Sequence, residues 1–254
     1  MHPVSAVIIT KNEEKNIGRC LQALQKVADE IIVVDALSTD RTTEIAKGLG
    51  AKIFSIEWTG FGPQKNFGLR QASHDYIVAL DADEVLTNEA IEEIKQLKEE
   101  GFKGVYELPL KNFYFGKFLR YKDYKKRIFN KTEVQWNNNE VHEGLIIPQN
   151  YPVLKLNGGI EHYSYYSIEQ YILKSNLYSG IAANELFRKN KRSYLIKLLF
   201  SPAYTFFQSY ILKSGFADGM HGFIVAMFNG YTSFLKYAKL WELCRNEKRN
   251  KSKK

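Results

Sequence analysis

Short apolar runs alternate with amphipathic stretches over about the first hundred residues of the chain. Unbroken apolar runs are typical of strands buried on both faces of a parallel sheet, whereas apolar residues spaced three and four apart indicate helices. The expected strands are 4–9, 30–34, 51–56 and 76–80, and the expected helices are 17–27, 42–49, 64–72 and 88–99. This alternation predicts an α/β fold with a mostly parallel sheet flanked by helices.

The pattern changes after residue 104. Short strand-like segments with Gly and Pro between them predict an antiparallel extension that completes a first domain over 1–166; they lie at 105–110, 114–119, 125–129 and 144–147. Helical spacing returns near Ser167, and we expect a helical appendage over 167–246. Its aromatic-rich stretches predict contact with a membrane interface or with a second subunit. We expect the basic tail, 247–254, to be disordered.

Composition narrows the class of protein only a little. The chain has 254 residues and a net charge of +8, which suits phosphate-bearing ligands, nucleic acid or anionic membranes without choosing among them. Its two cysteines make neither a disulfide framework nor a zinc motif. The N-terminal sequence does not read as a signal peptide, and no apolar run reaches the roughly 18 residues of a spanning helix. We therefore expect a cytoplasmic protein at the inner face of the cytoplasmic membrane.

Polar residues follow three of the expected strands at the point where each ends. Asp35 follows the second strand, and the pair Asp81 and Asp83 follows the fourth. The first strand ends in Thr10, Asn12 and Glu13. The carboxyl ends of parallel strands share one edge of a sheet, where α/β folds bind ligands. A carboxylate pair there suits a hard divalent cation that in turn holds phosphate oxygens; the alternative for each residue is a turn or a helix cap.

Three motifs carry a resemblance to a known family. The segments 7–14 (VIITKNEE), 32–42 (IVVDALSTDRT) and 79–84 (ALDADE) resemble the motifs of family 2 glycosyltransferases, in that order. The resemblance implies a GT-A (Rossmann-like) fold that binds a nucleotide-diphosphate sugar through Mg²⁺ or Mn²⁺ and inverts the anomeric carbon. One departure is that many members have Ser-Gly where this chain has Ala36-Leu37. A Gly there would allow a positive φ, so the loop conformation is in question.

The same resemblance implies roles for individual residues. It places Thr10, Asn12, Glu13 and Asp35 around the base and ribose, Asp81 near the ribose and diphosphate, and Asp83 on the metal. The segment 64–66 (QKN) falls where the family often has Ala-Arg-Asn, so Lys65 is expected to offset diphosphate charge and Asn66 to bind substrate.

The middle of the chain resembles one branch of the family. The segments 112–120 (NFYFGKFLR), 126–129 (KRIF) and 141–144 (VHEG) are similar to the lipopolysaccharide core β-glucosyltransferase-like branch. Inversion needs a base that deprotonates the acceptor hydroxyl, and the favoured candidate is Glu143, followed by His142; both could instead be structural loop residues. Arg127 could contact a phosphate or be an exposed strand residue. His162 could be a further metal or diphosphate ligand, and the alternative is a hydrogen-bonded structural histidine.

The reaction expected from these features is transfer of a hexose from a nucleotide-diphosphate sugar to a glycan or lipid-linked acceptor, as in lipopolysaccharide core or other cell-envelope glycan synthesis. A nucleotidyltransferase is one alternative, although that class usually opens with a Gly-rich phosphate loop, and here residues 10–14 read TKNEE. A basic nucleic-acid- or membrane-binding module is another, but it does not explain the polar strand ends. We expect no nucleic-acid partner, a peripheral membrane contact, and an oligomer as an open alternative.

Overall fold

The computed structural model describes residues 1–137, 144–191 and 195–251. The chain divides into two compact units. The first, here the sheet unit, comprises Met1–Lys111 and Lys122–Tyr163; the second, here the helical unit, comprises Asn112–Tyr121 and Ser164–Lys254. The functional roles expected for the two parts of the chain stay predictions.

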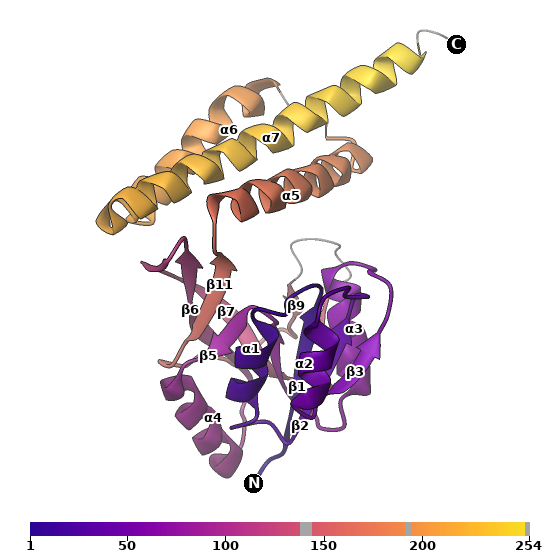
Figure 1. Ribbon diagram of the computed structural model, residues 1–254, viewed down its shortest axis with the longest axis vertical. Coiled ribbons are helices and arrows are strands. Elements are labelled where there is room, and N and C mark those ends of the chain that lie inside the picture. The colour runs from indigo at the N-terminus through magenta and orange to yellow at the C-terminus, as the bar shows by residue number, and fades with distance from the viewer. Residues whose placement is uncertain (138–143, 192–194, 252–254) are drawn as a thin grey trace. The chain divides into compact units, whose positions relative to one another are not determined.

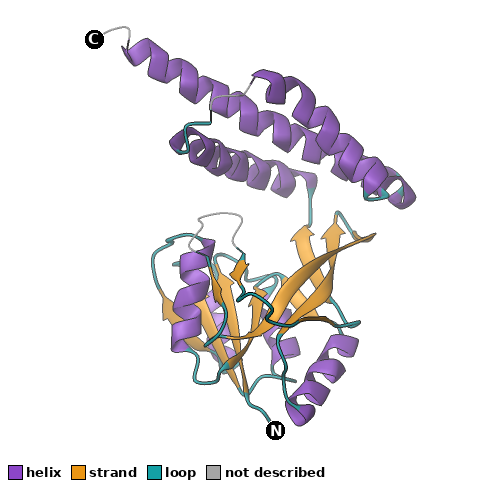
Figure 2. Ribbon diagram, turned by 180° about the vertical axis from the view of Figure 1, so that it is seen from behind, coloured by secondary structure: helices purple, strands orange, loops and turns teal. Residues whose placement is uncertain are grey.

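The larger sheet has a parallel core with a mixed extension. Its strand order is β3-β2-β1-β4-β7-β6-β11-β5, with β10 paired to β6. The core strands are β1 (Val4–Thr10), β2 (Glu30–Asp35), β3 (Lys52–Ser55) and β4 (Tyr76–Asp81). β1 runs parallel to both β2 and β4, and β2 runs parallel to β3, which confirms the predicted parallel sheet. Figure 2 shows these strands with helices against them.

The expected antiparallel extension is also confirmed. The additional strands are β5 (Glu84–Leu86), β6 (Val105–Tyr114), β7 (Lys117–Asn130), β8 (Gln135–Trp136), β9 (Leu145–Ile146), β10 (Val153–Lys155) and β11 (Ile160–Tyr165). β7 pairs antiparallel with β4, and β8 and β9 form a separate two-stranded antiparallel sheet. The sequence predicted two short strands, 114–119 and 125–129, where the structure has the single strand β7. The turn lies before β7 and not between those two segments. Phe115 and Gly116 both have positive φ, as a tight hairpin turn requires.

Helices cover both faces of the parallel core (Figure 1). The helices are α1 (Ile17–Leu24), α2 (Thr42–Gly48), α3 (Phe61–Gln71) and α4 (Asn88–Glu100). Alternate residues of β1 divide between two hydrophobic clusters. Ile8 packs in the cluster that contains residues of α1, α2 and α4, and Val7 packs in the cluster that contains Leu69 of α3. The unbroken apolar pattern of β1 therefore reflects burial on both sides.

The described residues of the helical unit form three long helices: α5 (Ile168–Arg188), α6 (Leu195–Phe207) and α7 (Met220–Lys251), with a π-helical turn (Gln208–Leu212) and a 3-10 turn (Gly215–Asp218) between the last two. α6 and α7 approach closely at Gly230, where an added Cβ would lie 3.0 Å from the carbonyl oxygen of Pro202. None of the helices described is long and apolar enough to cross a membrane.

The expectation of a disordered tail is wrong for the residues up to Lys251, because α7 continues through them. Glu247 and Lys251 form an i,i+4 ion pair of 2.9 Å. Basic side chains at the end of a helix also interact favourably with its dipole. Lys248, Arg249 and Lys251 therefore belong to the last helix.

Candidate active site

The strand register brings the predicted polar residues to one edge of the sheet. Thr10, the last residue of β1, lies opposite Asp35 at the end of β2. On the other side of β1, Ile9 lies opposite Asp81 at the end of β4. The carboxyl ends of three neighbouring strands therefore carry Thr10, Asp35 and Asp81 side by side, as the sequence predicts.

Asp81 lies between two buried cations. Its Oδ1 is 3.0 Å from Lys65 Nζ, and its Oδ2 accepts a 2.9 Å hydrogen bond from Arg127 Nη2. Burial opposes ionisation of Asp81, but Lys65 and Arg127 outweigh that effect and hold its pKa well below the usual range. Arg127 also donates to Glu84, which is buried. Burial raises the pKa of Glu84, although Arg127 opposes the rise. Arg127 is thus a buried, ion-paired residue, not an exposed strand residue.

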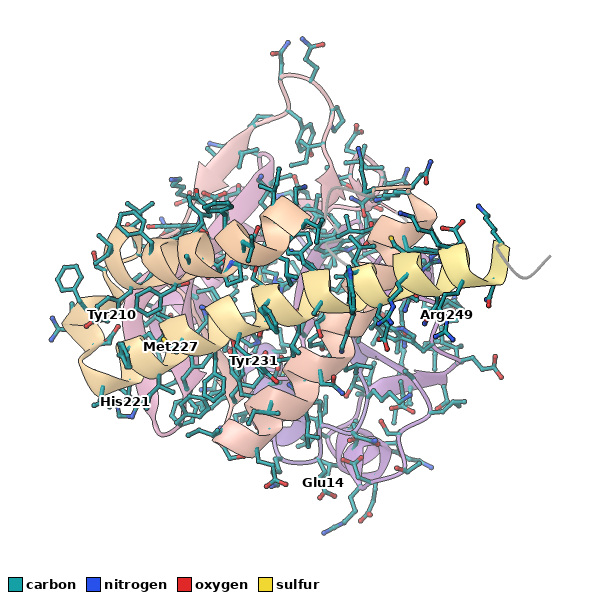
Figure 3. The ribbon with its side chains drawn as sticks, turned by 90° about the horizontal axis from the view of Figure 1, so that it is seen from above. Glu14, Tyr210, His221, Met227, Tyr231 and Arg249 are labelled. Atoms are coloured by element: carbon teal, nitrogen blue, oxygen red, sulfur yellow. The ribbon has the colours of Figure 1, made fainter. Side chains whose placement is uncertain are left out.

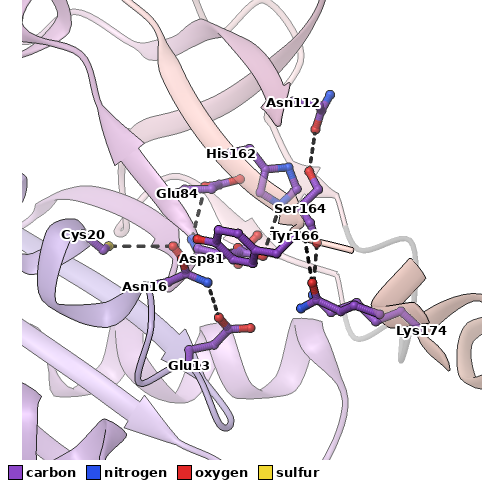
Figure 4. A network of polar contacts seen from close by, with 12 residues as sticks. Glu13, Asn16, Cys20, Asp81, Glu84, Asn112, His162, Ser164, Tyr166 and Lys174 are labelled. Carbon is purple, nitrogen blue, oxygen red and sulfur yellow. Dashed lines mark hydrogen bonds and ion pairs between the residues drawn. The ribbon is translucent and has the colours of Figure 1, made fainter. Parts of the chain in front are cut away.

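Asp83 pairs with His162 on the neighbouring strand. β5 and β11 are antiparallel, and His162 Nε2 lies 3.3 Å from Asp83 Oδ2. Burial alone would lower the pKa of His162, but Asp83, Glu84 and Asp81 outweigh it and raise that pKa. Figure 4 shows His162, Glu84 and Asp81 close together. This end of the sheet therefore concentrates carboxylates and cations in a small volume.

The protein side chains that the structure describes do not assemble a metal site alone. Among those residues, no three His, Cys, Asp or Glu side chains are grouped so that they could hold a metal ion. Asp83 and His162 form a pair, while Asp81 contacts Lys65 and Arg127. Joint metal ligation by Asp81, Asp83 and His162 stays a prediction, and a cation here would need further ligands from a bound molecule.

The loops that follow β1 and β2 are hydrogen-bonded to each other. Asn12 Oδ1 accepts a 2.8 Å hydrogen bond from the Thr39 amide. The Glu13 amide donates to Thr42 Oγ1 at 2.8 Å. Asn12 and Glu13 join the two loops that border the strand ends, and their expected place beside a nucleoside stays a prediction.

Asp35 is buried and organises the loop after β2. Its carboxylate accepts hydrogen bonds from the Ser38 amide at 2.9 Å and from Ser38 Oγ at 2.5 Å. Leu37, within this loop, has a φ of 56°, in the left-handed region that Gly enters without penalty. The chain therefore keeps the loop conformation that a Gly would allow, at a cost in backbone strain.

The first turns of α3 add further polar groups to this edge. The Asn66 side chain donates to the Trp136 carbonyl at 2.8 Å and accepts from the Trp136 amide at 3.0 Å, so it holds β8 against α3. Lys65 Nζ lies 4.7 Å from the centre of a Trp136 ring. Within the described part of the chain, the buried atoms Thr10 Oγ1, Gln64 Oε1 and Trp136 Nε1 have no hydrogen-bond partner. Buried polar groups are rarely left so, and their partner is often a ligand or water.

The two candidate bases, His142 and Glu143, lie outside the described residues. The residues that flank them are described: the Asn137 amide donates to the Gly144 carbonyl at 2.9 Å. Asn137 directly follows Trp136, whose ring Lys65 contacts. The segment that carries both candidates therefore begins and ends next to the charged cluster.

The sequence did not single out three residues that belong to the site. Glu84 was quoted only as part of a motif, and its signal was a third acid beside Asp81 and Asp83. Gln64 and Trp136 gave no signal of their own, because an isolated Gln or Trp is common on any buried surface. Their place in the site depends on the packing of α3 against β8.

Comparisons with known proteins agree with this geometry. The sequence profile described as "Glycosyl transferase family 2" matches residues 5–145. The chain is 33% identical over 260 residues to an uncharacterized glycosyltransferase of Rickettsia bellii, covering 94% of this chain and 86% of that protein. It is 29% identical over 251 residues to the lipopolysaccharide core biosynthesis glycosyltransferase LpsC of Rhizobium meliloti, covering 94% and 92%.

A solved structure shares the fold. The crystal structure of S. aureus TarS 1-349 in complex with UDP superposes with a TM-score of 0.50 at 15% sequence identity, covering 98% of this chain and 92% of that one. The fold is therefore GT-A-like, as the resemblance implied. With the family profile covering more than half of the chain, this protein belongs to glycosyl transferase family 2.

Proposed function

We propose that the protein is an inverting glycosyltransferase that moves a hexose from a nucleotide-diphosphate sugar to a glycan or lipid-linked acceptor of the cell envelope. The observation that carries this proposal is the end of the parallel sheet, where buried cations and carboxylates adjoin buried polar atoms without partners among the described residues. Such atoms favour a polar ligand, because leaving them unpaired costs free energy.

The donor would lie across the strand ends. Thr10, Asp35 and the amide of Gln64 offer hydrogen-bonding groups for a nucleoside. Lys65 and Arg127 are held in place by Asp81, so their positive charges are already oriented where a diphosphate would bind. Orientation before binding lowers the cost of ordering these long side chains.

Asp83 and His162 fit a divalent cation that is shared with the donor. Mg²⁺ and Mn²⁺ are commonly held by one or two carboxylates together with phosphate oxygens and water, so two protein ligands are sufficient. When bound, the cation would take up negative charge on the departing nucleoside diphosphate.

The chemistry needs one proton transfer. A base removes the proton from the acceptor hydroxyl, whose oxygen attacks the anomeric carbon from the face opposite the nucleotide. The bond between that carbon and the diphosphate oxygen breaks, and its electron pair leaves with the nucleoside diphosphate. Glu143 is the proposed base and His142 the alternative. The hydrogen bond between Asn137 and Gly144 supports this assignment, because it holds the ends of their segment beside the cluster.

One relative supports the proposed acceptor class. LpsC is named for lipopolysaccharide core biosynthesis and aligns over 94% of this chain. At 29% identity the likeness supports a cell-envelope glycan acceptor as the class to test.

The test is a thermal-shift panel of UDP-, GDP-, CMP- and dTDP-sugars with Mn²⁺. A ligand at about 100 times its Kd stabilises the native state by about 2.7 kcal/mol, which raises Tm by several degrees. One donor class should raise Tm in the unaltered protein and in Glu92→Gln, which changes an exposed carboxylate of α4. Asp83→Asn should lose most of that shift.

Product analysis with the donor identified in this way completes the test. Release of the nucleoside diphosphate with acceptor glycosylation is expected. If no nucleotide sugar shifts Tm, or if pyrophosphate is released instead, the proposed reaction is wrong and a nucleotidyltransferase becomes the better assignment.

A further inference from the structure

The helical unit exposes an unusual amount of apolar surface along α6. No residue of α6 is buried, and Leu199 is 72% exposed. The exposed large apolar residues of α6 and the π-helical turn are Leu195, Ile196, Leu199, Phe200, Tyr204, Phe207, Ile211 and Leu212. Their spacing of three and four residues places most of those on α6 along one side of the helix.

A second apolar stripe runs along α7, which lies beside α6 (Figure 3). Its exposed large apolar residues are Met220, Phe223, Met227, Tyr231, Phe234 and Trp241. They also recur at helical spacing. The two stripes together are called here the α6–α7 surface. Large exposed apolar side chains gathered on two neighbouring helices point to a site of protein or membrane interaction.

The charges near the α6–α7 surface are mostly positive. Between residues 195 and 241 the chain has four lysines and a single acidic residue, Asp218. Asp218 is buried, its Oδ1 lies 3.2 Å from Lys117 Nζ, and its Oδ2 accepts from the Arg120 amide at 3.0 Å. The charged groups of this segment that are available to a partner are therefore cationic. The end of α7 adds the acids Glu242 and Glu247 and the basic residues Arg245, Lys248, Arg249 and Lys251, so the net charge stays positive.

This charge distribution favours lipid over a second copy of the chain. A two-fold dimer brings the same patch of each subunit together, so mainly positive charges would face one another, with Glu242 as an exposed carboxylate to offset them. An anionic bilayer supplies the opposite charge. In such an interface, Tyr and Lys lie at headgroup depth while Leu, Phe and Met enter the acyl boundary. Tyr204, Tyr231 and Lys197 are available to lie at headgroup depth. Leu199 and Phe200 are available to enter the acyl boundary.

We propose that the α6–α7 surface binds in the plane of an anionic lipid bilayer, with its apolar side chains inserted and its lysines at the headgroups. The binding combines apolar insertion with attraction between charges. Salt shortens the screening length to about 3 Å at 1 M and weakens the second contribution but not the first. Release from vesicles at high salt should therefore be partial.

The experiment is co-sedimentation of the full chain with vesicles of phosphatidylcholine alone and of phosphatidylcholine with phosphatidylglycerol. The unaltered protein should pellet with the anionic vesicles and pellet less with the neutral ones. The double variant Leu199→Glu/Phe200→Glu should lower the partition coefficient at least about tenfold, because two large apolar side chains are lost from the contact. The matched control is Val153→Glu, which places the same charge at an exposed apolar position of β10 in the sheet unit. It should pellet like the unaltered protein.

Light scattering on the same proteins tests the alternative that a second copy of the chain covers the α6–α7 surface. A chain that stays in the supernatant with both vesicle types overturns the proposal. So does a dimer that Leu199→Glu/Phe200→Glu converts to a monomer, because the surface would then be an interface between copies. Equal loss of pelleting in Val153→Glu would also overturn it. Binding of nucleotide sugars in solution does not depend on these residues, so this test and that of the donor site can fail separately.

Discussion

The sheet unit and the helical unit differ in which kind of group, polar or apolar, lacks a partner within the unit. In the sheet unit the apolar residues of the parallel strands are buried on both faces, and the groups without partners among the described residues are polar atoms near the strand ends, such as Thr10 Oγ1. In the helical unit the polar groups are largely bonded internally, and the apolar side chains of α6 are exposed. The first arrangement suits a small polar ligand, and the second suits an apolar environment.

The exposure in the helical unit is not a result of loose packing. Tyr171 donates to Asn229 at 2.7 Å, and Asn229 donates to Ser209 at 3.0 Å, so side-chain hydrogen bonds connect α5, α7 and the π-helical turn. Tyr171 also packs against Phe228, with ring centres 4.9 Å apart. The helices therefore pack and hydrogen-bond to one another on their inner sides. The apolar side chains on the outside remain available for a partner.

The largest change in the free energy of unfolding is expected from removing Arg127. This variant tests whether Asp81, Glu84 and Arg127 form one cluster shielded from solvent. Arg127→Met should lower the free energy of unfolding by about 3–5 kcal/mol, because Glu84 would remain buried, and Asp81 half-buried, without their shared cation. Urea denaturation followed by circular dichroism measures it. The control Lys95→Met removes an exposed i,i+3 ion pair on α4 and should cost about 0.5 kcal/mol or less. Equal effects of the two variants would show that the cluster is solvated.

The next effect tests whether the chemistry resides in the sheet unit. Glu143→Gln keeps the shape of the side chain but removes the proton acceptor, so turnover should fall roughly 10²-fold or more while donor affinity is retained. Steady-state kinetics together with donor titration measures both quantities. Near-normal turnover in Glu143→Gln with a large loss in His142→Ala would transfer the role of base to His142. Leu199→Glu on α6 should leave turnover with a water-soluble acceptor unchanged.

A smaller effect compares the two ends of β2. Glu30, at the end remote from the site, accepts hydrogen bonds from Lys52 at 2.7 Å and Ser5 at 2.5 Å, and from Ser73. Burial opposes its ionisation, but these donors lower the pKa of Glu30 from 4.5 to about 2. Because the folded pKa is lowered, the stabilisation is complete above pH 4.5 and is lost as the pH falls through 2.

Glu30→Gln should therefore lower the free energy of unfolding by about 1.5–3 kcal/mol at pH 7, the range for hydrogen bonds to charged groups. The difference from the unaltered protein should shrink as the pH approaches the lowered pKa. Denaturation midpoints measured from pH 7 downwards give the profile. A difference independent of pH would mean that packing, and not the charge, is responsible.

The smallest effect concerns the loop beside Asp35. Leu37→Gly should stabilise the protein by about 0.5–1 kcal/mol, because relief of the left-handed strain exceeds the entropy that Gly adds to the unfolded chain. The denaturant midpoint should rise without a change in slope. Ala36→Gly, at a buried position next to it, should be destabilising. Destabilisation by both variants would show that the Leu37 side chain, although half exposed, makes a useful contact.

Much of the sheet unit could be predicted from local pattern. The strands β1, β2 and β4 coincide with unbroken apolar runs, and the polar residues at their ends lie together because parallel strands share a direction. α3 begins at Phe61, earlier than the helix expected over 64–72, and Pro63 lies in its first turn, where Pro is tolerated. The helical end of α7 was missed because a run of basic residues resembles a solvated tail.

The sequence alone determined the order of the elements, the sharing of one sheet edge by Thr10, Asp35 and Asp81, and the family. These depend on side-chain periodicity and on short motifs, which are local properties of the chain. Tertiary structure alone decided that Arg127 and Lys65 enclose Asp81, that His162 pairs with Asp83, and that α6 leaves its apolar side exposed. Each of these joins or separates residues far apart in the chain, and such contacts arise from the packing of whole elements, which no local pattern encodes.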